Sequence, residues 1–138
     1  MKRIVRVLLI VIAVLLLMVV ALTAVAFYKG VIGRPVRWEI PAGYRGWMVI
    51  RYEDISCPPL QVRGIYFVIP VTSSGHGCTA SSIPLGWRYH RYEYVHPDGR
   101  RTRAEVHPIS YNPIKKRELI FVGTETELKT NYGAAPWW

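Results

Sequence analysis

A long apolar run close to the N-terminus constrains this chain more than any other feature. From Val7 to Tyr28 no residue is charged, and nearly all are Val, Leu, Ile, Ala or Met. At about 1.5 Å per residue, a helix of that length reaches about 33 Å, enough to cross the hydrocarbon core of a bilayer, which is about 30 Å thick. Arg6 and Lys29 flank the run. We therefore predict one transmembrane helix over residues 7–28, with the lipid bilayer as its partner and residues 1–6 as a cytoplasmic segment.

A cleavable signal peptide is the competing interpretation of this segment. Its start is basic (Lys2, Arg3, Arg6), and Ala24-Val25-Ala26 resembles a cleavage site. In that case the protein would be secreted after cleavage near Ala26. The apolar core of a signal peptide is usually about 7–15 residues long, however, and this run is longer, so we prefer an uncleaved anchor. No cysteine follows the run directly, which argues against a lipoprotein anchor.

The orientation of the predicted anchor is decided by features other than charge. Lys29, Arg34 and Arg37 nearly balance the basic residues before the run, so the positive-inside rule does not discriminate. A pair of cysteines in the rest of the chain favours an oxidising compartment, and the start of the chain resembles an export signal. We predict a single-pass protein of the bacterial inner (cytoplasmic) membrane, with its N-terminus in the cytoplasm and its C-terminal domain periplasmic or extracellular.

The rest of the chain has room for one small domain. The protein has 138 residues, and the roughly 110 that follow the apolar run are near the lower limit for a stable core. Glycine and proline in residues 29–35 indicate a linker. We assign residues 36–130 to the domain and residues 131–138 to an irregular tail.

Short segments rich in β-branched and aromatic residues dominate this domain, and turn-forming residues separate them. No stretch has apolar residues at helical spacing over three turns. The pattern predicts an all-β fold behind the helix: a small antiparallel β-sandwich of about seven strands, immunoglobulin- or transthyretin-like. Thr124 and Glu127 have capping-box spacing, which predicts a short helix. The segments with the clearest strand signal are Val36–Ile40, Trp47–Tyr52, Ile65–Ile69, Trp87–Val95 and Leu119–Val122.

Two cysteines, Cys57 and Cys78, each lie next to turn-forming residues. A disulfide between them would contribute roughly 3 kcal/mol in the chain-entropy model, a large share for a domain of this size. Two reduced, unrelated thiols are the alternative, and they would be expected if the domain were cytoplasmic.

The chain is basic, with a net charge of +9. The basic residues are spread along the chain rather than clustered, so we do not predict nucleic-acid binding. A solvated surface beside an anionic membrane is the simplest interpretation. The sharper hypothesis is an anion-facing patch, with lipid headgroups or an acidic polysaccharide as partners. Its members would be Arg88, Arg91, Arg100, Arg101 and Arg103.

No motif in the domain specifies a reaction. A nucleophilic Cys78 would need a base, and His76 is close in sequence, but no known nucleophile signature surrounds either cysteine. The four histidines match no metal-binding spacing. We therefore predict no catalytic residue, no metal and no cofactor.

Aromatic residues are unusually frequent for so small a domain. We expect Trp47 and Trp87 to lie in the core. Trp137 and Trp138 at the C-terminus are not obvious core residues, and they are candidates for a contact with a partner or with the membrane interface.

Four stretches together resemble a bacterial family of small envelope domains, the domain of unknown function numbered 6843. The resemblance extends from about Ile40 to Glu127, and it implies an exported or membrane-anchored β-sandwich without any known catalytic residue. The stretches are Ile40–Trp47 running into Arg51-Tyr52, Cys57-Pro-Pro-Leu60, Ile69–Ser82 leading to Gly86-Trp87, and Tyr92–Arg101 with Phe121-Val-Gly-Thr124.

These observations lead to one functional prediction and two alternatives. The prediction is a non-enzymatic module that binds or scaffolds another component of the bacterial envelope, such as a second envelope protein. The alternatives are a hydrolase that uses Cys78 and a histidine, and an accessory subunit of a larger membrane complex.

Overall fold

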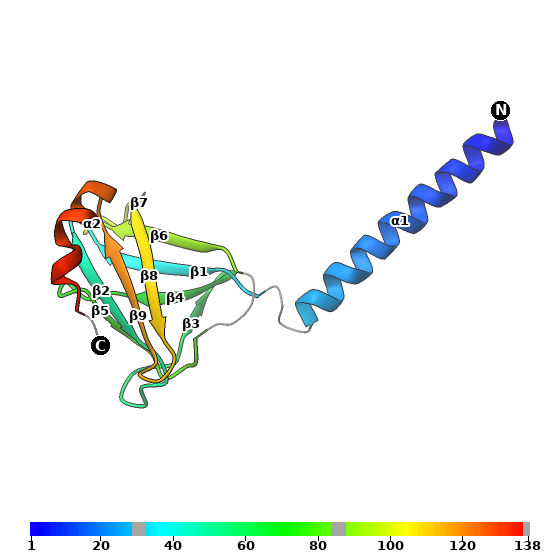
Figure 1. Cartoon of the computed structure of the whole chain (residues 1–138). Helices are drawn as coiled ribbons and strands as arrows, with labels where there is room; N and C mark the ends of the chain where they lie inside the picture. The colour runs from blue at the N-terminus through cyan, green and yellow to red at the C-terminus, as the bar shows by residue number, and fades with distance from the viewer. Residues whose placement is uncertain (29–32, 84–87, 137–138) are drawn as a thin grey trace. The chain divides into compact units, whose positions relative to one another are not determined.

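A computed structural model gives the fold of the chain and describes residues 1–28, 33–83 and 88–136. The chain divides into two compact units: one contains the N-terminal helix, and the other is a β-domain that begins at Arg34 (Figure 1). Trp87, Trp137 and Trp138, for which we predicted a core position or a contact, lie outside the described residues.

The N-terminal unit contains one continuous α-helix, α1 (Lys2–Tyr28). Within it, Arg3–Phe27 has a mean hydropathy of 3.3 and is long and apolar enough to cross a membrane. The helix begins before the predicted start at Val7, because the basic residues of the first turns are themselves good helix formers. A signal sequence has the same properties, so the absence of cleavage stays a prediction.

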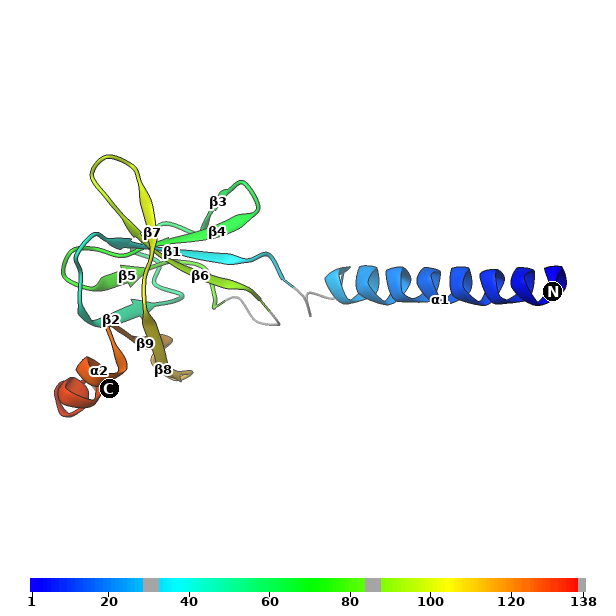
Figure 2. The ribbon, with the colours of Figure 1, turned by 90° about the horizontal axis from the view of Figure 1, so that it is seen from above.

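The described part of the β-domain contains nine strands in two sheets (Figures 1 and 2). The five-stranded sheet has the order β3-β4-β1-β6-β7, and the four-stranded sheet has the order β5-β2-β9-β8. In Figure 1 the strands β8 and β9 cross the direction of β1 and β6. The strands are β1 (Val36–Pro41), β2 (Gly46–Arg51), β3 (Gln61–Arg63), β4 (Tyr66–Pro70), β5 (His76–Cys78), β6 (His90–Val95), β7 (Arg101–Arg103), β8 (Val106–Asn112) and β9 (Arg117–Val122).

The prediction of a β-sandwich is confirmed, but the prediction that it is antiparallel is wrong. The strand β1 runs parallel to both β4 and β6, and β2 runs parallel to β5. The reason is the connection between β1 and β2, where Gly43 at φ 80° helps to turn the chain into the other sheet. Each of these strands is then paired with strands that arrive through longer crossover connections, and such connections permit parallel pairing.

The core lies between the two sheets and follows the alternation of the strands. On β1 and β2 every second side chain is buried, as a strand with one face in the core requires. Each such apolar side chain contributes about 1.5–3 kcal/mol relative to an exposed position. The side chains of β1, β2, β4 and β9 that belong to this core cluster are Val36, Trp38, Ile40, Met48, Ile50, Ile69, Ile120 and Val122.

Trp47 lies on the opposite face of β2, so the prediction that it belongs to the core is wrong. It is half-buried and contacts the edge of the Phe121 ring, with the centroids 5.0 Å apart, and the ring of Tyr132. Its indole Nε1–H donates to the carbonyl oxygen of Asn131 at 3.2 Å. Trp47 therefore contacts the C-terminal end of the chain instead of the space between the sheets.

The predicted helix after Thr124 is confirmed as α2 (Glu125–Asn131). The Thr124 hydroxyl accepts a hydrogen bond from the backbone N–H of Glu127, whose carboxylate in turn accepts one from the backbone N–H of Thr124. These reciprocal bonds form the expected capping box. A short 3-10 helix (Tyr132–Ala134) follows within the stretch that we expected to be irregular.

Candidate functional site

Cys57 and Cys78 form a disulfide, as predicted, with their Cα atoms 5.9 Å apart. It joins the loop after β2 to the end of β5, which pairs with β2. Neither sulfur is a free thiol. His76 lies on the exposed side of β5, and Cys78 is not a nucleophile while the disulfide is intact.

An opening at one edge of the sandwich arises because β7 is short. Its three residues pair only with the second half of β6, from Glu93 to Val95. The chain then enters the other sheet as β8. A cleft of about 860 Å³ is left beside the first half of β6. Its lining is Tyr89, His90, Arg91, Tyr92, Glu93, Arg101, Arg103, Ala104, Glu105, Val106 and Pro108.

Three of the five arginines predicted to face an anion line this cleft: Arg91, Arg101 and Arg103. The other two lie elsewhere. Arg88 donates to the carbonyl oxygen of Arg34 at 2.9 Å, and its guanidinium lies over a phenylalanine ring. Arg100 belongs to the turn between β6 and β7. The predicted patch is therefore divided, and its three-arginine part is the candidate site.

Two carboxylates hold Arg91 and Arg101 in place. The side chain of Glu93 is only 5% exposed; it forms an ion pair with Arg91 and lies 3.5 Å from a guanidinium nitrogen of Arg101. Arg101 also reaches Glu39 on the adjacent strand β1 at 2.8 Å. Charged groups that are paired in this way lose less conformational freedom when a ligand arrives, which favours binding.

Arg103 differs from these two arginines. It is exposed, lies opposite Glu93 in the β6–β7 register, and forms no ion pair with any carboxylate in the described part of the chain. The lining of the cleft contains three arginines and only two acidic residues, Glu93 and Glu105. Glu93 is paired with Arg91 and Arg101, and the lining as a whole carries one more positive than negative charge. Arg103 is therefore its available donor for an anion.

A stack of rings borders the cleft on its inner side. Trp38 of β1 stacks on Tyr92 with the ring centroids 5.4 Å apart, and its indole Nε1–H donates to Nδ1 of His90 at 3.2 Å. Because Nδ1 accepts this bond, the neutral imidazole carries its proton on Nε2. Burial lowers the pKa of His90, and the nearby charge of Arg88 lowers it further. Tyr89, at 68% exposure, adds an aromatic face that is open to solvent.

A second polar group lies inside the sandwich. The Tyr52 hydroxyl donates to a Glu118 carboxylate oxygen at 2.6 Å. Burial raises the pKa of Glu118 and also that of Tyr52, so the tyrosine stays a donor. Neither residue lines the cleft, and we assign the pair to the interior of the domain.

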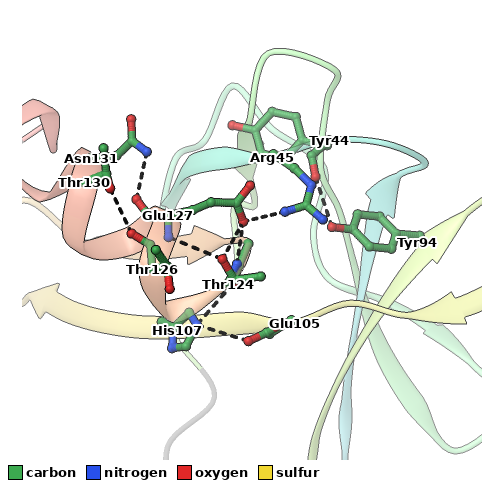
Figure 3. Close-up of polar contacts among 11 residues, drawn as sticks. Tyr44, Arg45, Tyr94, Glu105, His107, Thr124, Thr126, Glu127, Thr130 and Asn131 are labelled. Atoms are coloured by element: carbon green, nitrogen blue, oxygen red, sulfur yellow. Dashed lines mark hydrogen bonds and ion pairs between the residues drawn. The ribbon is translucent and has the colours of Figure 1, made fainter.

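A third polar cluster attaches the N-terminus of α2 to the turn between β1 and β2 (Figure 3). Arg45, from the turn between β1 and β2, points toward Glu127 of α2 and forms an ion pair with it. Hydrogen bonds from Thr124 lower the pKa of Glu127. On β8, His107 lies 3.1 Å from the carbonyl oxygen of Gly123. These groups bond to one another, so we assign the cluster to attaching the helix.

Metal-binding geometry was not found in the described part of the chain. No three side chains from His, Cys, Asp and Glu come together there in a way that could hold a metal ion. The candidate site is the cleft with its three arginines, the carboxylates of Glu93 and Glu105, the aromatic rings and His90.

The fold and the site together define a small two-sheet β-domain that follows an apolar helix in the sequence. The domain has one disulfide and an arginine-lined cleft at an open edge. Residues 37–133 match the model of the Family of unknown function (DUF6843), and the chain belongs to that family. This confirms the resemblance noted in the sequence.

One solved structure has a similar fold, the crystal structure titled "Putative Lipoprotein from Bacillus anthracis". The two chains share 16% identity with a TM-score of 0.57, over 67% of this chain and 72% of the other. At this identity the similarity establishes the fold alone. No curated protein matches the chain.

Proposed function

We propose that this protein is a non-enzymatic binding module of the bacterial envelope. In this proposal α1 anchors it in the cytoplasmic membrane, the β-domain lies outside the cytoplasm, and the cleft binds an envelope glycan that carries carboxylate or phosphate groups. The location is supported by the apolar helix and by the disulfide, since disulfides persist in oxidising compartments. The name of the structurally similar protein, "Putative Lipoprotein", agrees with an envelope location.

The observation that carries the proposal is the position of Arg103, which has no carboxylate partner in the described part of the chain and lies beside two arginines that are already held in place. A carboxylate or phosphate group at this position would accept charge-assisted hydrogen bonds from its guanidinium. The buried carboxylate of Glu93 orients Arg91 and Arg101 without cancelling the charge of Arg103.

The aromatic residues favour a glycan over a simple ion. Tyr89 offers an exposed ring next to the arginines, and a sugar ring presents apolar C–H groups that pack on such a face. His90 presents an N–H group on Nε2 in its neutral form, a suitable donor to a sugar hydroxyl. A cleft of about 860 Å³ is large enough for several sugar units.

A binding role is also supported by the state of the groups that catalysis would need. The hydrolase alternative requires a free thiolate on Cys78, and this sulfur is bonded to Cys57. In the cleft, Nδ1 of His90 is occupied by Trp38, and Glu93 is surrounded by arginines. These groups are arranged to hold side chains in position.

The test is a calorimetric titration of the full chain in a zwitterionic detergent. We expect binding of galacturonate oligosaccharides, weaker binding as salt rises, and no binding of uncharged malto-oligosaccharides of the same length. The variant Arg103→Gln should weaken binding about tenfold or more, because a hydrogen bond to a charged group contributes about 1.5–3 kcal/mol.

Arg100→Gln is the matched control, because Arg100 is exposed near Asp98 in the β6–β7 turn and does not line the cleft. Its affinity should stay within about twofold of the wild type. An equal loss in both variants would mean that the cleft is not the site. Absence of binding to the acidic oligosaccharide would overturn the glycan proposal.

A further inference from the structure

Two isoleucines at loop tips are almost completely exposed in the β-domain. Ile55 follows β2 and is 96% exposed; Ile114 lies in the turn between β8 and β9 and is 90% exposed. Among the described residues of this domain, no other large apolar side chain is as exposed. Each forgoes, in the isolated chain, the hydrophobic stabilisation that burial would provide.

The two loops are neighbours. The backbone N–H of Tyr52, which precedes the first loop, donates to the carbonyl oxygen of Lys116 in the second at 2.8 Å. The ammonium group of Lys116 also lies 3.7 Å from a carboxylate oxygen of Glu53. Ile55 and Ile114 therefore belong to one region, which we call the isoleucine tips and define as residues 53–56 and 113–116.

Both loops are held by specific hydrogen bonds, so the exposure does not result from an unstructured segment. In the first loop a carboxylate oxygen of Asp54 accepts from both the N–H and the hydroxyl of Ser56, at 3.0 and 2.6 Å. In the second, Asn112 Oδ1 accepts from the backbone N–H groups of Ile114 and Lys115, at 3.0 and 2.9 Å. Turns favour small polar residues at such positions, and the side chain of an isoleucine does not stabilise the turn itself.

Basic residues surround the isoleucine tips. The acidic groups Glu53 and Asp54 are each paired, with Lys116 and with Arg51. Lys115 and Arg117 have no carboxylate partner in the described part of the chain and leave the region positive. Protruding aliphatic side chains next to unpaired basic ones suit the interface of an anionic bilayer, where apolar groups enter the acyl boundary and cations meet headgroups.

We propose that the isoleucine tips dock on the anionic surface of the bilayer that holds α1. The inference rests on the proposed anchor and is independent of the cleft. The chain between Tyr28 and Arg34 spans at most about 20 Å when fully extended, so an anchored domain is always near the headgroups. Docking would add an apolar and an electrostatic contact to this tether.

The experiment uses the full chain reconstituted in vesicles of phosphatidylcholine with phosphatidylglycerol. The substitution Ile114→Cys introduces a third cysteine. Its thiol is the only free one, because the two native cysteines are bonded to each other. This thiol is labelled with a nitrobenzoxadiazole fluorophore. The matched control is Asp98→Cys at the tip of the β6–β7 turn. We expect a blue-shifted emission, strongly quenched by brominated lipid, at position 114 and a water-like, unquenched emission at position 98.

Two further measurements sharpen the test. Adding Ile55→Asn should reduce quenching at position 114 several-fold. The use of vesicles of phosphatidylcholine alone should reduce it to a similar degree.

A water-like emission at position 114 in anionic vesicles would overturn the docking proposal while leaving the cleft proposal intact. A blue shift that rises with protein density and is not quenched by brominated lipid would show that a second copy covers the tips, which also overturns it. If the chain does not remain with the vesicles, both the proposed anchor and this docking proposal are contradicted.

Discussion

The indole N–H of Trp38 donates to Nδ1 of His90 over 3.2 Å, joining the buried centre of β1 to a residue that lines the cleft. Protonation of His90 would place a hydrogen on Nδ1 and break this bond. Burial is the main reason that the pKa of His90 lies below its ordinary value of 6.5.

This relationship predicts a pH-dependent stability. The unfolded chain takes up the proton more readily than the folded one, so the free energy of unfolding is highest above about pH 6.5 and falls as the pH drops toward the lower folded pKa. Urea titrations of the full chain should show this loss between about pH 7.5 and about pH 5.5. His90→Gln should reduce the slope, whereas the exposed His76→Gln should not. Identical slopes in the wild type and in the His90 variant would contradict the interpretation.

Glu118 should behave in the opposite way. Burial raises the pKa of this carboxyl group above 4.5, so the stability that it contributes is present below the unfolded pKa and is lost as the pH rises through the folded pKa. Glu118→Gln should therefore be more stable than the wild type at neutral pH, and the difference should disappear near pH 4.

Removal of the Tyr52 hydroxyl tests the same hydrogen bond by changing its donor. Tyr52→Phe leaves the Glu118 carboxylate without its donor and should cost about 1–3 kcal/mol at neutral pH. Tyr111 packs its ring against that of Tyr52, and in the described part of the chain its hydroxyl does not donate to Glu118, so Tyr111→Phe should cost less. Chemical denaturation provides both values, and an equal cost for the two variants would mean that the hydrogen bond is unimportant.

In the cluster around α2, the contribution of the N-cap to stability can be measured separately from that of the ion pair between Arg45 and Glu127. Thr124→Ala removes the N-cap hydroxyl and should lower stability by about 1 kcal/mol. Arg45→Ala removes only an exposed ion pair and should cost about 0.5 kcal/mol or less. Thermal or urea unfolding of the two variants checks the order, and a larger loss for Arg45→Ala would reverse our ranking of these contacts.

The disulfide should account for a large part of the stability of the domain. Replacing Cys57 and Cys78 by alanine should lower the free energy of unfolding by roughly 2–4 kcal/mol. The single variant Cys78→Ala should lose about as much, with the thiol of Cys57 now reactive. A titratable thiol in the native wild type, or a Cys78→Ala variant of unchanged stability, would favour the catalytic alternative.

Several elements were predictable because their signal is local. The composition of residues 7–28 was sufficient for α1, and alternating β-branched and aromatic residues located β1, β2, β4, β6 and β9 to within a few residues. The spacing of Thr124 and Glu127 located the start of α2. The disulfide followed from there being only two cysteines in a chain with an export-type start.

Other elements carry no local signal. The strands β5 and β7 have three residues each, too few to show a period, and Pro108 with the register shift beside it interrupts the pattern of β8. The parallel pairing of β1 depends on which sheet β2 enters, a tertiary choice that alternation does not encode. The cleft was missed for a similar reason, because it exists only where β7 stops covering β6. Arg88 does not line the cleft, and no local signal shows this because the carbonyl oxygen of Arg34, to which it donates, is distant in sequence.

The central claim is that α1 anchors the β-domain outside the cytoplasm, and a pair of reporter fusions after Trp138 tests it most directly. Alkaline phosphatase, which is active only outside the cytoplasm, should be active in this fusion, while green fluorescent protein exported by the same route should stay dark. The mass of the protein in the membrane fraction should correspond to an intact N-terminus. A fluorescent fusion with inactive phosphatase would contradict the location, and a protein that begins at Phe27 would contradict the anchor.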